Sequence, residues 1–100
     1  MFETQSTISE WAETTFGYCK REAAINRMLQ EVEELKKIDL YNLDSFNKMS
    51  DECADILITL YRIADCYSFD LHKKVDHKMA INRGRKWKSN GDGTGQHIKE

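Results

Sequence analysis

Apolar residues recur at intervals of three and four over most of the chain, which is the period of an α-helix. Four segments follow this pattern: 6–17, 20–38, 50–67 and 70–87. Ser6 or Thr7 is the expected N-cap of the first segment, and Gly17 its expected end. Ser50 and Asp70 are the expected caps of the third and fourth segments. We therefore expect helices in these four segments, with a loop between the second and the third.

The third segment carries the widest apolar face, because Ile58 and Tyr61 broaden a stripe that already includes Leu57 and Leu60. Such a helix is expected to be central and covered on more than one side. The fold class we predict is all-α, a helical bundle of about four helices that is completed by oligomerisation. Residues 1–88 are expected to form one helical domain, and residues 89–100 a glycine-rich C-terminal tail that is loose or folds over phosphate.

The composition narrows the classes of function. The 100 residues include no proline, and a helical chain of this size has a thin core, so we expect an oligomer. The net charge of −2 argues against a nucleic-acid partner. No apolar run is long enough to span a membrane, so we expect no membrane segment, and we expect no signal peptide. The 3 cysteines form no CxxC pair, and Cys53 and Cys66 lie among apolar positions, so buried reduced thiols and a cytoplasmic location are expected.

Two acidic pairs have the same three-residue spacing, Glu31 with Glu34 and Glu52 with Asp55. Residues three apart share a helix face, so each pair can point toward one site. On a helical wheel Glu52 falls inside the apolar arc of its segment, where a carboxylate is costly to bury unless it is paired or bound to a cation. Glu33 lies on the opposite flank and can pair with Lys37.

Antiparallel packing of the second and third segments would bring the two acidic pairs together. The 17 residues between Glu34 and Glu52 leave room for a helix end, a loop and a return. Ligation by carboxylate oxygens alone selects a hard cation, Mg²⁺ or Mn²⁺. No histidine or cysteine spacing indicates zinc. The other interpretation, that these acids are solvated surface groups, stays open on spacing alone.

The sequence "QEVEE" at 30–34, followed by "ECAD" at 52–55, resembles the hallmark of the MazG-like all-α nucleoside triphosphate pyrophosphohydrolases. That hallmark reads E-E-x-x-E, a variable gap, then E-x-x-D, and Gln30 stands in place of its first Glu. The resemblance extends over residues 8–98, through "ISEWAETTFG", the K-x-x-x-N-R pattern of the last helix and "DGTGQHI".

The resemblance implies Mg²⁺-dependent cleavage of a nucleoside triphosphate to the monophosphate and pyrophosphate, as house-cleaning of unwanted nucleotides. It implies that Glu31, Glu34, Glu52 and Asp55 are the metal ligands and the catalytic groups. It also implies assembly as a homodimer or homotetramer. Water is expected to attack the α-phosphorus, and the base is one of these carboxylates, with the outer Glu34 as a candidate.

Basic and aromatic residues are the candidates for binding the substrate. Lys78, Asn82 and Arg85 would share one helix face at i, i+4 and i+7 and contact phosphate or sugar. Without the resemblance, a solvated helix end is the better explanation for them. Trp11 is the first candidate for stacking on a base, with Phe16 and Trp87 as further candidates. Two alternatives remain: a related pyrophosphohydrolase acting on dUTP or phosphoribosyl-ATP, and a non-catalytic helical oligomer that binds or regulates a partner.

Overall fold

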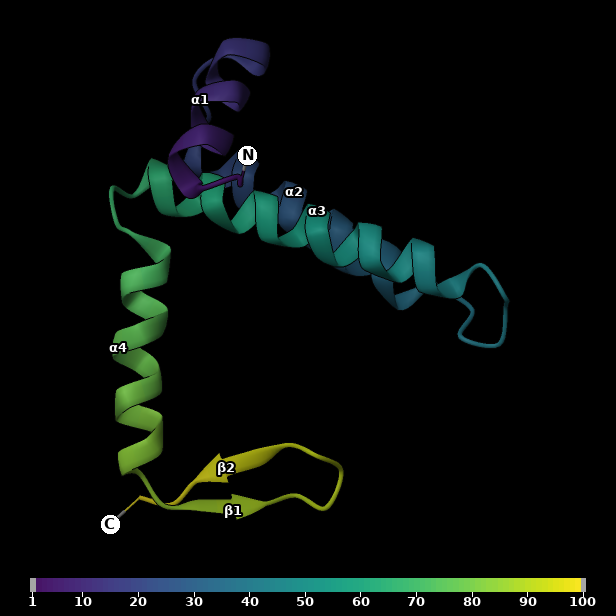
Figure 1. Ribbon diagram of the computed structural model, residues 1–100, viewed down its shortest axis with the longest axis vertical. Helices are drawn as coiled ribbons and strands as arrows, with labels where there is room; N and C mark the ends of the chain where they lie inside the picture. Colours follow the sequence, from purple (N-terminus) through teal and green to yellow (C-terminus); the bar gives the residue numbers. More distant parts are fainter. Residues whose placement is uncertain (1, 100) are drawn as a thin grey trace. The chain divides into compact units, whose positions relative to one another are not determined.

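The computed structural model describes residues 2–99, and in this part of the chain helices dominate (Figure 1). The elements in chain order are α1 Gln5–Phe16, α2 Arg21–Lys36, α3 Ser45–Cys66, α4 Leu71–Gly84, β1 Trp87–Ser89 and β2 Gly95–His97. This confirms the predicted all-α class, to which a small hairpin is added. The chain divides into two compact units, one ending at Asp70 and the other beginning at Leu71.

The first unit is built on α2 and α3, which lie side by side and run in opposite directions, with the loop 37–44 joining them (Figure 1). Helix α1 packs against α3. Three of the residues buried in this unit are alanines: Ala12, Ala24 and Ala64 are at most 5% exposed. Small side chains let helices approach closely, so the alanines set the spacing at which residues of α2 and α3 face each other.

Helix α1 begins earlier than predicted, because its N-cap is Thr4, two residues before Ser6 and three before Thr7. The Thr4 hydroxyl accepts a hydrogen bond from the Thr7 N–H at 3.2 Å, and the Thr7 hydroxyl accepts one from the Thr4 N–H at 2.8 Å. This reciprocal capping satisfies two N–H groups that the helix itself leaves without partners. Thr7 is therefore part of the cap but not its first residue. Gly17 ends the helix as expected, with a φ of 85°.

Helix α3 begins at Ser45, so Ser50 is not its cap. The Ser50 hydroxyl donates to the carbonyl of Asn47 at 3.0 Å, inside the helix. No glycine or proline interrupts residues 45–50, and nothing therefore prevents the helix from extending backward into the predicted loop.

Helix α3 is less covered than its apolar face predicts. Cys53 is exposed, Leu57 is 44% exposed and Ile58 is 37% exposed. The expectation of a buried Cys53 is therefore wrong for a single chain. Helix α3 is central, as predicted, because both α1 and α2 pack against it, but they leave part of its apolar face exposed. The apolar arc of α3 is wider than α1 and α2 together can cover.

The second unit consists of α4 and the hairpin of β1 and β2. Helix α4 ends at Gly84, three residues short of the prediction, and Trp87 opens a strand that pairs antiparallel with His97. The Trp87 indole N–H donates to the carbonyl of Asn82 at 2.7 Å, which ties the hairpin to the end of the helix. Residues 89–97 therefore belong to a hairpin and not to a loose tail.

None of the helices in residues 2–99 is long and apolar enough to cross a membrane.

Candidate metal centre and adjoining pocket

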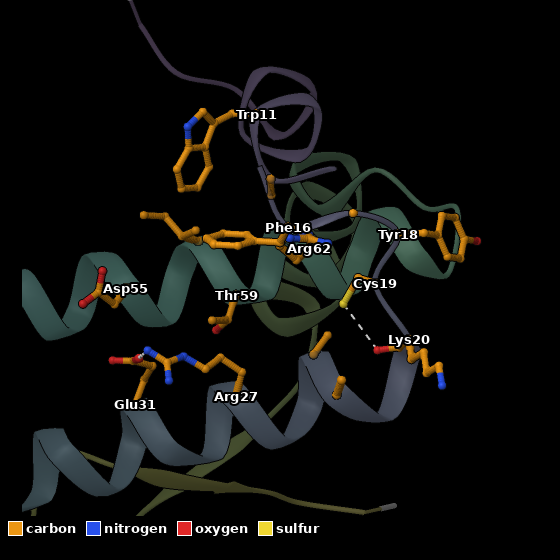
Figure 2. Close-up of a pocket in the computed structure, with 15 residues that line it drawn as sticks. Trp11, Phe16, Tyr18, Cys19, Lys20, Arg27, Glu31, Asp55, Thr59 and Arg62 are labelled. Atoms are coloured by element: carbon orange, nitrogen blue, oxygen red, sulfur yellow. Dashed lines mark hydrogen bonds and ion pairs between the residues drawn. The ribbon is translucent and has the colours of Figure 1, made fainter. Parts of the chain in front are cut away.

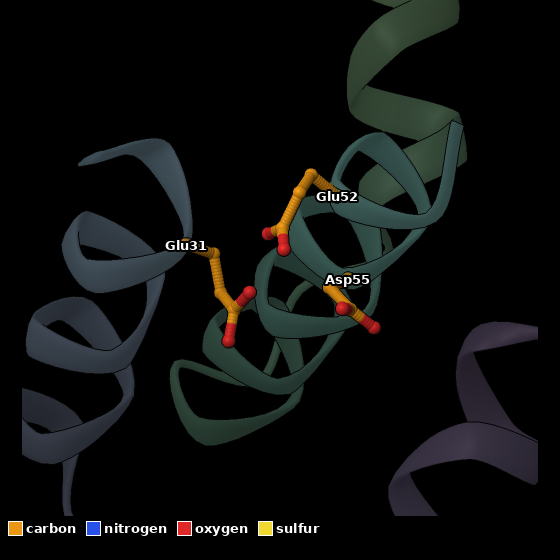
Figure 3. A group of neighbouring side chains, drawn as sticks. All are labelled: Glu31, Glu52 and Asp55. Atoms are coloured by element: carbon orange, nitrogen blue, oxygen red, sulfur yellow. The ribbon is translucent and has the colours of Figure 1, made fainter. Parts of the chain in front are cut away.

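Carboxylates from α2 and α3 converge where the two helices face each other (Figure 3). Glu31, Glu52 and Asp55 each offer an oxygen, and these oxygens lie within 4.8 Å of one another. Glu31 is buried, Glu52 is half-buried and Asp55 is exposed, so the cluster runs from the helix interface to the solvent. The three-residue step from Glu52 to Asp55 and the antiparallel packing of α2 bring these groups together, as the spacing predicted.

Glu34 lies one turn beyond Glu31 on α2 and is exposed. Its negative charge helps to raise the pKa of Glu52, so it belongs to the same electrostatic environment. Glu33 is outside this group and lies 3.6 Å from Lys36 in an exposed ion pair, rather than pairing with Lys37 as expected. The two adjacent acids of α2 thus differ in surroundings, as the helical wheel indicated.

Glu52 has the most perturbed environment of the cluster. Its pKa is raised to about 7, first by hydrogen bonding with the Glu31 carboxyl group and by loss of solvation, and then by the charges of Glu34 and Glu31. Its Oε2 atom is buried and has no hydrogen-bond partner. A buried oxygen without a partner among repelling carboxylates is unfavourable in itself and suited to binding a cation. Because the donors are all carboxylate oxygens, they suit a hard divalent ion.

Arg27 compensates part of this negative charge. Its Nη2 lies 2.8 Å from Oε1 of Glu31, and its Nη1 donates to the amide oxygen of Gln30 at 3.2 Å. The sequence analysis did not identify this residue. The signal was present, since Arg27 precedes Glu31 by four residues, the spacing at which side chains on a helix meet.

A pocket of about 700 Å³ adjoins the cluster; it is open to solvent and lined by residues of α1, the linker 17–20, α2 and α3 (Figure 2). Glu31 and Asp55 lie on its wall, together with the aromatic rings of Trp11 and Phe16. These two rings meet edge to face, with centroids 5.4 Å apart, and are 56% and 70% exposed. The pocket therefore joins an acidic end to exposed aromatic surface.

The predicted phosphate-binding residues belong to the second unit. Lys78 and Asn82 lie on α4, four residues apart, as predicted. Arg85 does not share their helix face, because α4 ends at Gly84; its backbone N–H donates to the carbonyl of Asn82 at 3.3 Å. The glycine that follows Arg83 allows the chain to leave the helix there. A role in substrate binding stays a prediction for all three residues.

The loop 90–94 of the hairpin is held by its own hydrogen bonds. The N–H of Thr94 donates to Asp92 Oδ1 at 3.0 Å, and the N–H of Gly91 donates to the Ser89 hydroxyl at 3.1 Å. Hydrogen bonds from Thr94 also lower the pKa of Asp92. Two of the backbone N–H groups that the prediction assigned to phosphate therefore already have partners within the loop.

No model of a known protein family matches the chain. A curated relative is the dATP/dGTP diphosphohydrolase of Salmonella phage PMBT28, which is 34% identical over 96 residues. The aligned segment covers 96% of this chain and 31% of that protein, so the chain spans about a third of the length of the curated relative it matches.

Solved structures share the fold. A Cyanophage S-2L MazG-like pyrophosphohydrolase, bound to dGDP and three catalytic Mn²⁺ ions per active site, superposes with a TM-score of 0.77 at 27% identity, over 96% of this chain and 90% of that one. iMazG from Vibrio DAT 722 gives a TM-score of 0.58 at 20% identity, over 81% of this chain and 95% of that one. The Bacillus-conserved MazG protein, a nucleotide pyrophosphohydrolase, gives 0.56 at 17% identity, over 86% and 94%.

Proposed function

Because the chain belongs to the MazG-like family, we propose that it hydrolyses a nucleoside or deoxynucleoside triphosphate to the monophosphate and pyrophosphate. The observation that carries this proposal is the convergence of three carboxylates, Glu31, Glu52 and Asp55, beside a pocket. Two of them, Glu31 and Asp55, line this pocket together with aromatic rings. The name of the Salmonella phage relative, a dATP/dGTP diphosphohydrolase, supports this class of substrate. The cyanophage structure, with dGDP and Mn²⁺ bound, supports it as well.

Glu31, Glu34, Glu52 and Asp55 are the residues that would hold Mg²⁺ or Mn²⁺. The buried Oε2 of Glu52 and the all-carboxylate donor set fit such an ion. When bound, the metal would neutralise charge on the phosphates and lower the pKa of a water molecule. Attack of water at the α-phosphorus breaks its bond to the bridging oxygen, and pyrophosphate leaves.

The surroundings of other side chains suit them to base stacking, proton transfer and phosphate binding. Trp11 and Phe16 are exposed on the pocket wall, where a base can stack on either ring. Glu34 is the most accessible carboxylate of α2 beside the cluster, which suits it to accept the proton of the attacking water. Lys78, Asn82 and Arg85 supply positive charge and hydrogen bonds to phosphate or sugar in this proposal.

A second copy of the chain completes the fold in the same proposal. Among residues 2–99 the buried apolar side chains are Ala12, Ala24, Tyr61 and Ala64, which is a thin core. Leu57 and Phe46 on α3 are 44% and 78% exposed. Burial of this surface in a homodimer or homotetramer would supply stabilisation that one chain lacks. A cytoplasmic location agrees with the free cysteines.

The proposal is tested with a panel of NTPs and dNTPs in the presence of Mg²⁺ or Mn²⁺, including dUTP, and with phosphoribosyl-ATP. We expect pyrophosphate release from at least one nucleotide by the wild type. Glu52→Gln should reduce turnover about 100-fold or more, since even partners of metal ligands contribute 10–100-fold. Glu33→Gln, on the opposite flank of α2, is the matched control and should leave turnover unchanged.

Preferential turnover of dUTP or phosphoribosyl-ATP would show that the chain is a related pyrophosphohydrolase with a different substrate. Absence of turnover of every nucleotide by folded protein, with metal binding also absent, would favour the non-catalytic binding protein and contradict the proposal.

A further inference from the structure

Arg27 lies where the carboxylate cluster meets the pocket. Its guanidinium is 2.8 Å from the carboxylate of Glu31, a member of the cluster, and its side chain also lines the pocket that carries Trp11 (Figure 2). The two partners differ in burial: the Arg27 side chain is 63% exposed, whereas that of Glu31 is 5% exposed. The pair therefore joins a fixed buried anion to a cation that can move.

Glu31 can be neutralised by Arg27 or by a divalent ion, and both compete for the same carboxylate. A divalent ion carries the larger charge and would be shared by Glu52 and Asp55, whose oxygens lie within 4.8 Å of that of Glu31. The ion pair of an exposed arginine is weak in comparison, because water screens it and its long side chain loses freedom. The second arm of the guanidinium is held only by the neutral amide of Gln30, which adds no ionic attraction.

A guanidinium displaced from Glu31 has a suitable partner nearby. Its planar set of N–H donors matches two oxygens of a phosphate group, and this bidentate arrangement is stronger than a contact between neutral groups. A nucleotide that stacks on Trp11 or Phe16 and extends its phosphates toward Glu31 passes along the wall that Arg27 lines.

We propose that Arg27 is a substrate-binding residue that exchanges partners: it neutralises Glu31 before the metal binds and moves to a phosphate of the nucleotide afterward. This inference rests on the proposed function, since it takes the metal and the nucleotide to bind at this site. It assigns to one residue opposite effects on the two ligands, weaker binding of the metal alone and tighter binding of the nucleotide.

The pair of Lys36 and Glu33 on the same helix provides a matched control. These side chains are 3.6 Å apart and 68% and 60% exposed, and neither lines the pocket beside the cluster. Removal of the Lys36 charge changes the net charge of the protein by the same amount as removal of the Arg27 charge, without reaching the site.

The test compares wild type with Arg27→Gln, Arg27→Lys and Lys36→Gln. Calorimetric titration of Mn²⁺ in the absence of nucleotide should show Arg27→Gln binding the metal about three- to tenfold more tightly, because a competing cation is removed. In metal-saturated steady-state assays its KM should rise about tenfold or more, from the lost charge-assisted contact. Arg27→Lys should have the metal affinity of wild type and a KM between those of wild type and Arg27→Gln. Lys36→Gln should match wild type in both quantities.

Weaker or unchanged Mn²⁺ binding by Arg27→Gln would overturn the proposal, as would an unchanged KM. Circular dichroism establishes that each variant keeps the helical content of wild type. If wild type binds metal without turnover, the proposed reaction fails, and affinity for a triphosphate analogue that cannot be cleaved between its α- and β-phosphates replaces KM as the readout for Arg27. If wild type binds no divalent metal, both proposals fail.

Discussion

Glu52 combines two features that are unfavourable in a chain without metal: a buried oxygen without a hydrogen-bond partner and a pKa raised to about 7. Both have the same origin, because α2 places Glu31 and Glu34 against it while the helix interface excludes part of the surrounding water. The environment therefore favours the protonated carboxyl group, and metal binding requires that this proton leave.

The raised pKa of Glu52 predicts that the metal-free protein loses stability as the pH rises. The folded chain holds the Glu52 proton up to about pH 7, whereas the ordinary value is 4.5, so the folded state binds more protons than the unfolded state between these values. Stability from this group is complete below pH 4.5 and is lost as the pH rises through 7. Thermal unfolding in EDTA should show a decreasing Tm from pH 5 to pH 8.

Two comparisons isolate this effect. Added Mn²⁺ or Mg²⁺ should raise the Tm most at pH 8, where the carboxylates are ionised and bind the cation. Glu52→Gln should flatten the pH dependence over the same range in EDTA and remove most of the stabilisation by metal. A metal-free Tm that stays constant or rises from pH 5 to pH 8 would contradict the assigned environment of Glu52.

At the residue scale, the sequence predicted the carboxylate cluster but not the arginine that neutralises part of its negative charge. The spacing of Glu52 and Asp55, and the position of Glu52 inside an apolar arc, were sufficient to predict convergence with Glu31. The pair of Arg27 and Glu31 has an ordinary spacing of four, which surface helices show often, and spacing alone cannot reveal that one partner is 5% exposed.

Two residues after the end of α3 at Cys66, the backbone of Ser68 lies in the left-handed region, at a φ of 61°. The N–H of Ser68 donates to the carbonyl of Asp65 at 3.1 Å, and the N–H of Phe69 donates to that of Ala64 at 3.0 Å. This pair of hydrogen bonds is the Schellman end of a helix, at which glycine is the preferred residue. The side chain of serine is disfavoured there because its Cβ approaches the following carbonyl oxygen.

Ser68→Gly should therefore stabilise the protein by about 1 kcal/mol. Ser50→Gly is the matched control with the opposite sign, because Ser50 lies inside α3, where glycine should cost about 0.5 kcal/mol. Urea unfolding at fixed protein concentration measures both free energies. Equal effects of the two substitutions would show that the backbone geometry assigned to Ser68 does not determine the outcome.

The period of the apolar residues was sufficient to predict the four helices. The residues at which helices begin and end depend on local backbone geometry, which the period does not reveal. Gly17 was predicted correctly because its φ of 85° is available mainly to glycine. The start of α3 was predicted wrongly because serine is a common N-cap residue, but Ser50 lies inside the helix, which begins at Ser45. The hairpin was missed because three-residue strands around "NGDGT" offer too little alternation to distinguish them from a loop.

At the scale of the whole molecule, the exposed apolar surface of α3 is the feature that a single chain leaves unexplained. Phe46 is 78% exposed and Leu57 is 44% exposed, and Cys53 between them is exposed as well. These positions are separated by seven and four residues, so they share one helix face. From the sequence, Cys53 and Leu57 were expected in the core and Phe46 in a loop, because the apolar period does not distinguish burial within a chain from burial between chains.

Leu57→Lys should shift the protein toward the monomer, because a charge placed in an apolar interface is costly to desolvate. Leu57→Met conserves volume and hydrophobicity and should leave the assembly intact. Sedimentation velocity at several protein concentrations measures the distribution. A wild type that sediments as a monomer at all concentrations would contradict the predicted homo-oligomer and leave the exposed face of α3 without an assigned partner.

We propose above all that the cluster of Glu31, Glu52 and Asp55, with Glu34 beside it, directs hydrolysis at the α-phosphorus of a nucleotide. The most direct measurement is mass spectrometry of the products formed from a triphosphate in H₂¹⁸O with Mn²⁺ or Mg²⁺. The account predicts nucleoside monophosphate carrying one ¹⁸O and unlabelled pyrophosphate. Label in pyrophosphate, or release of inorganic phosphate with nucleoside diphosphate, would contradict it.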